Sequence, residues 1–209
     1  MSTVTEVRVF RGVALLSFDD APPMKVRLKH FKALPLQAGD DIDVEEYAAQ
    51  VAEAQRADAY EAALNSLDLC ARTREELRRS LLARGFVSGA VEATLDRLAD
   101  SGLVDDRRYA ERAVEVSAAR PVGVYAVRRK LRAKGIAEED AEAALDMLND
   151  AQQAEAAQRA ARSLLRRYAS LPARDGRAKL SQALARRGFS WEAVREAVDA
   201  VWEADEWDE

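Results

Sequence analysis

The chain of 209 residues has one cysteine and one histidine, and it lacks any long hydrophobic run free of charge. A lone cysteine cannot form an internal disulfide, and one histidine beside it supplies no Cys/His set for a metal ion. No apolar stretch approaches the ~20 residues that cross a bilayer. The N-terminus also lacks a basic start followed by an apolar segment and a cleavage site. We therefore expect a soluble, cytoplasmic protein with no metal, no cofactor and no membrane contact.

The sequence shows no motif of a known catalytic site. It contains no glycine-rich phosphate loop and no Ser/His/Asp set. Cys70 lies in an apolar stretch, and we predict that it is a small buried side chain rather than a reactive thiol. His30 is predicted to lie at the surface or half-buried, because no partner of a catalytic base stands near it. We expect that the protein is not an enzyme.

A three-residue motif of Arg or Lys, Gly and a bulky apolar residue occurs three times. The copies are Arg84-Gly85-Phe86, Lys134-Gly135-Ile136 and Arg187-Gly188-Phe189, spaced by 50 and 53 residues. Apolar residues recur at equal distances on both sides of each glycine. Recurrence at such a period predicts one helical supersecondary unit used in tandem. The fold class is therefore mostly α, with three tandem three-helix repeats that form an elongated curved body.

The N-terminal region has a different pattern. Short β-branched and aromatic runs between residues 4 and 28, broken at Arg11-Gly12, predict a small antiparallel sheet that must pack on the helices beside it. Helical periodicity begins near Val44. The predicted domains are a β-rich module (1–43), a lead-in helix with repeat 1 (44–104), repeat 2 (105–150), repeat 3 (151–204) and an acidic tail (205–209).

Several helix ends have clear signals in the sequence. Thr73 and Glu76 have the spacing of a capping box at a helix start. Gly85 is predicted to end that helix in a left-handed conformation. In repeat 3, a long helix is predicted from about Ala151 to Leu171, ending before Pro172.

Charge differs on the two sides of each glycine: the preceding helices are basic and the following ones acidic. Complementation of helix dipoles explains cations next to the glycines but not those farther away. We interpret the remaining basic residues as a partner-binding surface. Its candidate residues are Arg78, Arg79, Arg128, Arg129, Lys130, Arg132, Arg166 and Arg167. A helix-turn-helix that reads DNA is disfavoured, because the second helix, which would enter the groove, is the acidic one.

Two stretches resemble the RecX family of regulatory proteins. One runs from Glu75-Glu76-Leu77 to Arg84-Gly85-Phe86, and the more specific one runs from Leu98 to Ala110 and contains Gly-Leu-Val-Asp followed by Tyr-Ala. The segment Val127–Ile136 continues the match, and the resemblance covers about residues 58–204. Lys130 stands where the family often has Glu, and the third unit matches only in its Gly-Phe motif and spacing. The first 43 residues match nothing in the family.

The resemblance implies a noncatalytic negative regulator of the RecA recombinase. Such a protein binds RecA and its filament on single-stranded DNA, and restrains filament growth, ATP hydrolysis and strand exchange. We expect it to be a monomer. The alternative is a helical DNA-binding protein or repressor that places its basic helices on phosphate, and the net charge of −5 argues against binding by bulk charge alone. Whether the basic residues contact protein or phosphate stays open at this stage.

Overall fold

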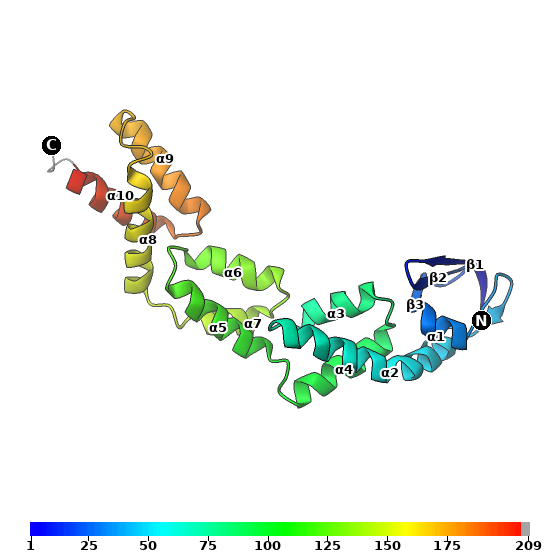
Figure 1. Cartoon of the computed structure of the whole chain (residues 1–209). Coiled ribbons are helices and arrows are strands. Elements are labelled where there is room, and N and C mark those ends of the chain that lie inside the picture. The colour runs from blue at the N-terminus through cyan, green and yellow to red at the C-terminus, as the bar shows by residue number, and fades with distance from the viewer. Residues whose placement is uncertain (206–209) are drawn as a thin grey trace. The chain divides into compact units, whose positions relative to one another are not determined.

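A computed structural model describes residues 1–205, and the chain divides into two compact units, Met1–Asp105 and the residues from Asp106 onward (Figure 1). The first unit contains β1 (Ser2–Phe10), β2 (Val13–Phe18), β3 (Met24–Arg27), α1 (Leu28–Ala33), β4 (Asp41–Ile42), α2 (Val44–Leu69), α3 (Arg74–Ala83) and α4 (Ser88–Asp100). The second contains α5 (Asp106–Ala118), α6 (Val124–Ala133), α7 (Glu138–Leu145), α8 (Asp150–Leu165), α9 (Ala173–Arg186) and α10 (Trp191–Asp205). The mostly helical fold with a small N-terminal sheet is confirmed.

The sheet has the strand order β3-β2-β1-β4, and its paired strands are antiparallel. Arg11 and Gly12 both have positive φ, at 48° and 80°, and form the tight turn between β1 and β2. The sequence predicted strand-forming runs as far as residue 28, but Leu28 instead begins α1, and its amide donates to the Gly12 carbonyl at 2.9 Å. Neither α1 nor β4 was predicted, because both are too short to produce a periodic pattern.

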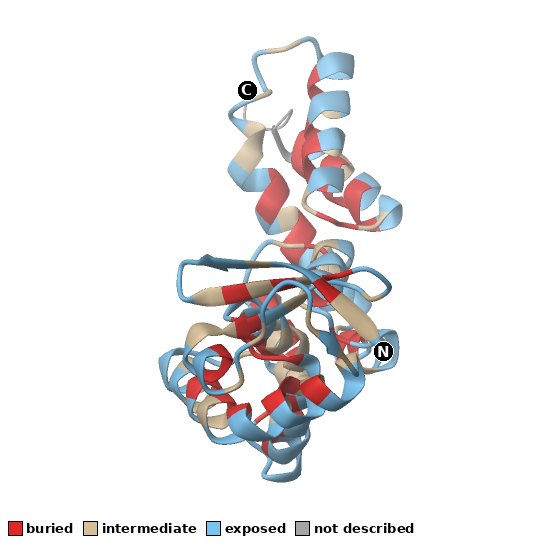
Figure 2. Ribbon diagram, turned by 90° about the vertical axis from the view of Figure 1, so that its right-hand side faces the viewer, coloured by how far each residue is buried: buried red, intermediate tan, exposed pale blue. Residues whose placement is uncertain are grey.

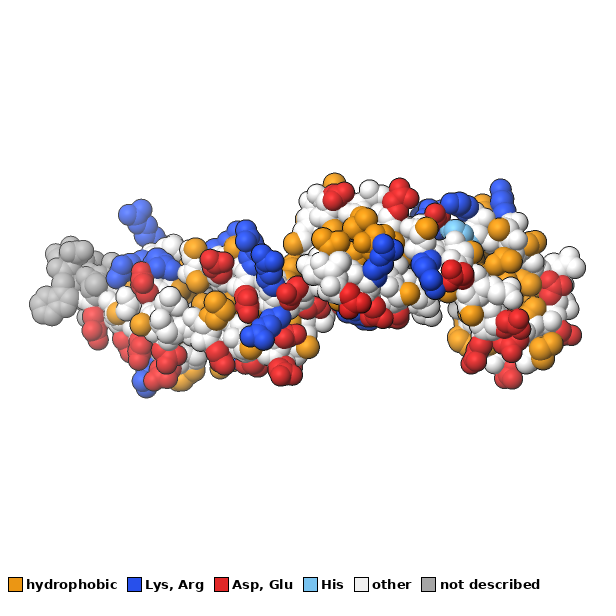
Figure 3. Space-filling view, turned by 90° about the horizontal axis from the view of Figure 1, so that it is seen from below, with side chains coloured by type: hydrophobic (Ala, Val, Ile, Leu, Met, Phe, Trp, Pro, Cys, Tyr) orange, Lys and Arg blue, Asp and Glu red, His pale blue; other side chains and the backbone are white. Residues whose placement is uncertain are grey.

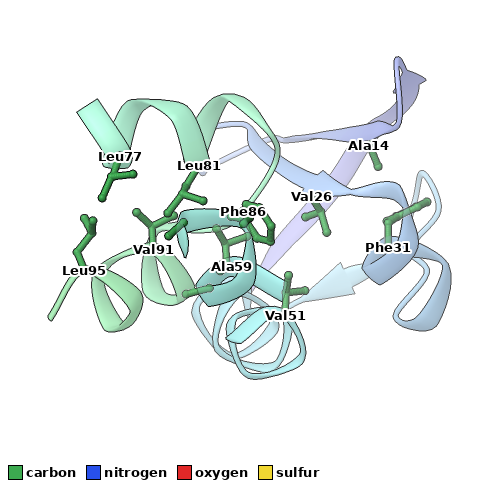
Figure 4. Close-up of a cluster of buried hydrophobic side chains, with 14 of the residues drawn as sticks. Ala14, Val26, Phe31, Val51, Ala59, Leu77, Leu81, Phe86, Val91 and Leu95 are labelled. Atoms are coloured by element: carbon green, nitrogen blue, oxygen red, sulfur yellow. The ribbon is translucent and has the colours of Figure 1, made fainter. Parts of the chain in front are cut away.

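The sheet and the helices of the first unit share one hydrophobic core. Leu16 and Val26 from the sheet are fully buried together with Val51 of α2 and Leu81 of α3. Figure 4 shows side chains from the strands and from the helices converging on the same interior, with Phe86 between them. Figure 2 shows the corresponding alternation of buried and exposed segments along the helices. The prediction that the β module depends on helical packing is confirmed.

The capping box at the start of α3 is present as predicted. The Glu76 amide donates to the Thr73 hydroxyl at 3.2 Å, and the Thr73 amide donates to the Glu76 carboxylate at 3.3 Å. At the other end of the helix, Gly85 has a φ of 82°, the left-handed conformation that the sequence predicted. We call the Gly85, Gly135 and Gly188 motifs the glycine turns.

The first glycine turn joins the sheet to the helices. The Gly85 carbonyl accepts hydrogen bonds from the Arg27 amide at 2.8 Å and from the Gln55 side-chain amide at 3.0 Å. The Gln55 side-chain carbonyl accepts from the Val87 amide at 2.7 Å. Gln55 is fully buried, and both ends of its side chain are satisfied. This one residue of α2 therefore fixes both sides of the turn.

The third glycine turn receives the start of α6. The Gly123 amide donates to the Arg187 carbonyl, and the Tyr125 amide donates to the Gly188 carbonyl, each at 3.0 Å. The backbones approach so closely that a Cβ on Gly188 would lie 2.3 Å from the Ala126 nitrogen. Repeats 2 and 3 are thus joined within the second unit by direct backbone contact.

Three expectations about individual positions are wrong. Cys70 is exposed, because it lies just beyond the last turn of α2. His30 is buried, because α1 packs against α2, where the Asp58 carboxylate lies 3.1 Å from the His30 ring nitrogen. Helix α8 ends at Leu165 rather than near Leu171.

The early end of α8 has a physical cause in the packing of repeat 3. The Tyr168 amide donates to the Leu165 carbonyl at 2.8 Å, three residues back, so the chain tightens and turns. The Tyr168 carbonyl then lies against Gly176 of α9, where a Cβ would be 2.8 Å from the carbonyl oxygen and 2.5 Å from the Trp202 ring. The predicted acidic tail begins at Asp205, the last residue of α10, and residues 206–209 lie outside the described residues.

We expect Gly188→Ala to destabilise the fold by about 2 to 4 kcal/mol, because it combines left-handed strain with a backbone clash. Gly102→Ala is the matched control. Gly102 also has positive φ, at 68°, but a Cβ there meets nothing within 4 Å, so the cost is about 1 kcal/mol. Urea unfolding followed by circular dichroism measures both. Equal losses of stability would contradict a role for the close approach.

Candidate partner-binding surface

The eight candidate residues lie on three segments of the described chain. Arg78 and Arg79 are on α3, and the next four are on α6. Arg166 and Arg167 follow directly after α8. The structure separates these residues into two groups according to whether a carboxylate of the same repeat holds them.

Arg78 is held between two carboxylates. Its guanidinium is 2.7 Å from Glu92 of α4 and 2.8 Å from Glu75 of α3. Arg79 contacts the other oxygen of Glu75 at 2.6 Å. Hydrogen bonding by Arg78 lowers the pKa of both Glu75 and Glu92 below the usual range, against the opposing effect of burial. The basic α3 and the acidic α4 are therefore partners of each other.

Repeat 2 reproduces this ion pair at the same distance from its glycine. Arg128 of α6 makes two hydrogen bonds of 2.6 Å to Glu142 of α7. Arg78 and Glu92 stand seven residues before and after Gly85, as Arg128 and Glu142 do around Gly135. Arg128 lowers the pKa of Glu142 through these bonds.

A second pair of positions, eleven residues on either side of the glycine, is also bridged. Arg74 contacts Asp96 at 2.6 Å in repeat 1, and Arg177 contacts Asp199 in repeat 3. The opposite charges of the two helices thus serve in part to bind the helices together within a repeat. Symmetric spacing of opposite charges about each glycine was the signal in the sequence that could have revealed these pairs.

The remaining candidates are directed outward. Arg129, Lys130 and Arg166 are exposed, and none of them has a carboxylate within ion-pair distance in the part of the chain that the structure describes. Arg167 is also exposed and lies 6.0 Å from the centre of the Tyr168 ring. Arg132 pairs with Glu138 at 2.8 Å, but both side chains are more than half exposed. Their charges remain accessible to a partner.

Two exposed aromatic residues, Tyr125 and Trp191, are further candidates that the pattern of charges in the sequence does not reveal. Tyr125 is 52% exposed and lies on the same helix as the α6 candidates, with the Arg128 guanidinium 5.5 Å from its ring. Trp191, the first residue of α10, is 75% exposed. Exposed Tyr, Trp and Arg side chains are the types that most often anchor protein interfaces. A helical pattern alone could not identify these two residues, because each lies on the first turn of its helix: Tyr125 on α6 and Trp191 on α10.

The described residues contain no group of His, Cys, Asp and Glu side chains that could hold a metal ion. Nor is any helix among them long and apolar enough to span a membrane.

Comparison with known proteins places the repeats in a family. Models of the first, second and third three-helix domains of RecX match residues 59–98, 105–145 and 150–198. The match to the third domain extends the resemblance beyond the Gly-Phe motif seen in the sequence.

Curated relatives are named regulatory protein RecX. The protein of Chromohalobacter salexigens is 38% identical over 63% of this chain and 84% of its own length. That of Halorhodospira halophila is 38% identical over 70% of this chain and 89% of its own. That of Limosilactobacillus reuteri is 32% identical over 78% of this chain, which spans only 63% of that relative.

Solved structures agree with these relatives. A crystal structure of regulatory protein RecX superimposes with a TM-score of 0.67 at 28% identity, covering 95% of this chain and all of the other. The RecX structure from Lactobacillus salivarius gives a TM-score of 0.65 at 28% identity, covering 71% of this chain and 97% of the other. Because the first of these structures covers 95% of this chain, its match includes residues of the N-terminal region, where the sequence alone showed no resemblance.

A double-mutant cycle of Arg78→Gln and Glu92→Gln tests the ion pairs. We expect a coupling of about 0.5 to 1 kcal/mol at pH 7, discounted because both side chains are partly exposed. The folded-state pKa of Glu92 is depressed, so this stabilisation is present above the unfolded pKa and is lost as the pH falls through the folded one. Urea unfolding between pH 7 and pH 3 measures it. An undiminished coupling at pH 3 would rule out the ionic contribution.

Proposed function

The chain belongs to the RecX family of regulatory proteins, and from that membership we propose that it is a noncatalytic negative regulator of the RecA recombinase. It binds RecA and the RecA filament on single-stranded DNA. By occupying the filament, it restrains filament growth, ATP hydrolysis and strand exchange. The proposal treats the chain as a monomer that acts in the cytoplasm, where RecA meets chromosomal DNA.

The exposed cations of α6 support a specific contact surface. Arg129 and Lys130 are adjacent, exposed and free of a carboxylate partner in the described part of the chain. A cation of this kind gains an ion pair on binding without losing an internal one, which favours it as the contact with a carboxylate or a phosphate. Arg128 is already committed to Glu142. We assign Arg128 to holding α6 against α7, and Arg129 and Lys130 to the partner.

The remaining candidates divide in the same way. Arg78 shapes repeat 1 through Glu75 and Glu92, whereas Arg166 and Arg167 extend the contact surface to repeat 3. Arg79 and Arg132 have internal partners but are 63% and 68% exposed, so they can contribute to binding by rearranging a weak surface pair. Tyr125 supplies an aromatic anchor on the same helix as Arg132.

Direct binding of DNA is the second candidate, and one observation favours it. Repeat 3 displays exposed basic side chains before, within and after the connection between α8 and α9, among them Arg162, Arg166, Arg174 and Lys179. Such a set fits phosphates. Its contribution to affinity would decrease steeply with added salt, because the release of counterions into a more concentrated salt solution is less favourable. Contact with DNA through repeat 3 is compatible with recombinase binding through repeat 2.

Hydrolysis of ATP by RecA on single-stranded DNA tests the main proposal. The wild-type chain should lower the rate at saturation, and Arg129→Glu with Lys130→Glu should weaken this inhibition by about tenfold or more in the concentration required, since two attractive contacts become repulsive. Recombinase turnover that is unaffected by saturating wild-type protein would refute the proposal.

The matched control is Arg107→Glu with Arg112→Glu. It makes the same change in net charge on exposed positions of α5, in the same repeat but outside the candidate surface. Inhibition should remain close to wild type. Equal loss of inhibition in both double variants would mean that overall charge, rather than the α6 surface, governs binding. Anisotropy of a labelled oligonucleotide without recombinase, measured across salt concentrations, separates direct DNA binding from this effect.

A further inference from the structure

A polar cavity of about 340 Å³ lies in the first unit, outside the candidate partner-binding surface. Three elements and one turn supply its lining, which includes Arg27, Lys29, Asp58, Glu61, Asn65 and Arg84. Figure 3 shows Lys and Arg side chains beside the single histidine, which marks this region of the molecule. Three of the six named side chains are basic and two are acidic.

Two arginines from distant parts of the sequence meet at this cavity. The guanidinium of Arg27, at the end of β3, lies 4.8 Å from the centre of the Phe86 ring, and that of Arg84, at the end of α3, lies 5.9 Å from the same centre. Neither has a carboxylate within ion-pair distance among the described residues, and Arg84 donates only a 3.3 Å bond to the Ala62 carbonyl. Both arginines therefore line the same cavity, and neither has a compensating carboxylate among the described residues.

The acidic side chains of the cavity do not supply that anion. Asp58 is engaged by Lys29 at 2.8 Å and by the buried His30 at 3.1 Å. Hydrogen bonding by Lys29 lowers the pKa of Asp58, so this carboxylate is charged and its charge is already matched. Glu61 is exposed on the wall of the cavity and forms no ion pair within the described residues. The lining as a whole therefore carries one net positive charge, and its two unpaired positive charges are on Arg27 and Arg84.

We propose that this cavity is a phosphate-binding site in which the guanidinium groups of Arg27 and Arg84 and the side-chain amide of Asn65 hold the oxygens. Planar guanidinium forks suit the oxygens of a phosphate, and two forks from different elements can bind one group together. The phosphate is free, part of a nucleotide or part of a nucleic acid. The site is independent of the proposed regulation of RecA.

Occupation of the site would also strengthen an existing junction. The Arg27 amide already donates to the Gly85 carbonyl, and Arg84 directly precedes that glycine. A phosphate shared by both side chains adds a second link between the sheet and the first glycine turn. Because a ligand that binds only the folded state raises its stability, phosphate should raise the melting temperature of the first unit.

Isothermal titration of the full chain with inorganic phosphate, in chloride buffer of constant ionic strength, tests the proposal. We expect saturable binding at one site, weakened about tenfold or more by Arg84→Gln or Arg27→Gln because each removes charged hydrogen bonds. Glu61→Gln should strengthen binding, since it removes a negative charge from the wall of the cavity. Arg84→Lys, which keeps the charge without the fork, should bind more weakly than wild type.

Arg97→Gln is the matched control. Arg97 also stacks on an aromatic ring, with its guanidinium 3.9 Å from the centre of Tyr60, but it lines a different cavity of the same unit. The affinity of the Arg97→Gln variant for phosphate should equal that of the wild-type chain. Titrations with ATP and with oligothymidylate then identify the source of the phosphate. The ligand that this site takes should bind more tightly than the other, and its affinity should fall more in the Arg84→Gln variant.

Absence of saturable phosphate binding overturns the proposal, and so does equal weakening by Arg97→Gln and Arg84→Gln. If Arg84→Gln does not fold, the opposite effects expected of Glu61→Gln and Arg84→Lys still decide the matter, and unchanged affinity in both overturns it. The assay of ATP hydrolysis by RecA does not measure the binding of phosphate to this chain. Failure of the phosphate site is therefore distinguishable from failure of the proposed regulation.

Discussion

The left-handed backbone of the glycine turns is the constraint on which the described packing depends. At Gly85 and Gly188 the absence of a Cβ lets another segment donate hydrogen bonds to the turn itself. At Gly85 the donors come from β3 and from the buried Gln55, and at Gly188 one comes from Tyr125 of the neighbouring repeat. The same motif that ends a helix therefore also binds elements from earlier in the chain.

The ion pairs across each repeat explain why charge is distributed so unevenly along the chain. Arg78 with Glu92 and Arg128 with Glu142 bind the helix before a glycine to the helix after it. Ion pairs this exposed each add little stability. They nevertheless engage basic side chains that the sequence alone assigned to a binding partner. What remains for recognition is a smaller set, with Arg129 and Lys130 at its centre. In the proposed function, recognition therefore rests on the cations that have no ion pair within their own repeat.

The N-terminal sheet contributes more than cover for the helices. Arg27, at the end of its third strand, brings a second guanidinium to the Phe86 ring beside Arg84. The resulting positive cavity belongs to neither module alone. It shows how a region without resemblance to the family in sequence can add a property to the repeat that it packs against.

The sequence by itself determined the repeats, the capping box at Thr73 and the turn at Gly85, because each depends on residues close together in the chain. Only the tertiary structure decided which cations are paired and which are free, that His30 is buried and that α8 ends at Leu165. Those properties depend on side chains from separate helices that approach in space. Local periodicity carries no information on such distances until the helices have packed.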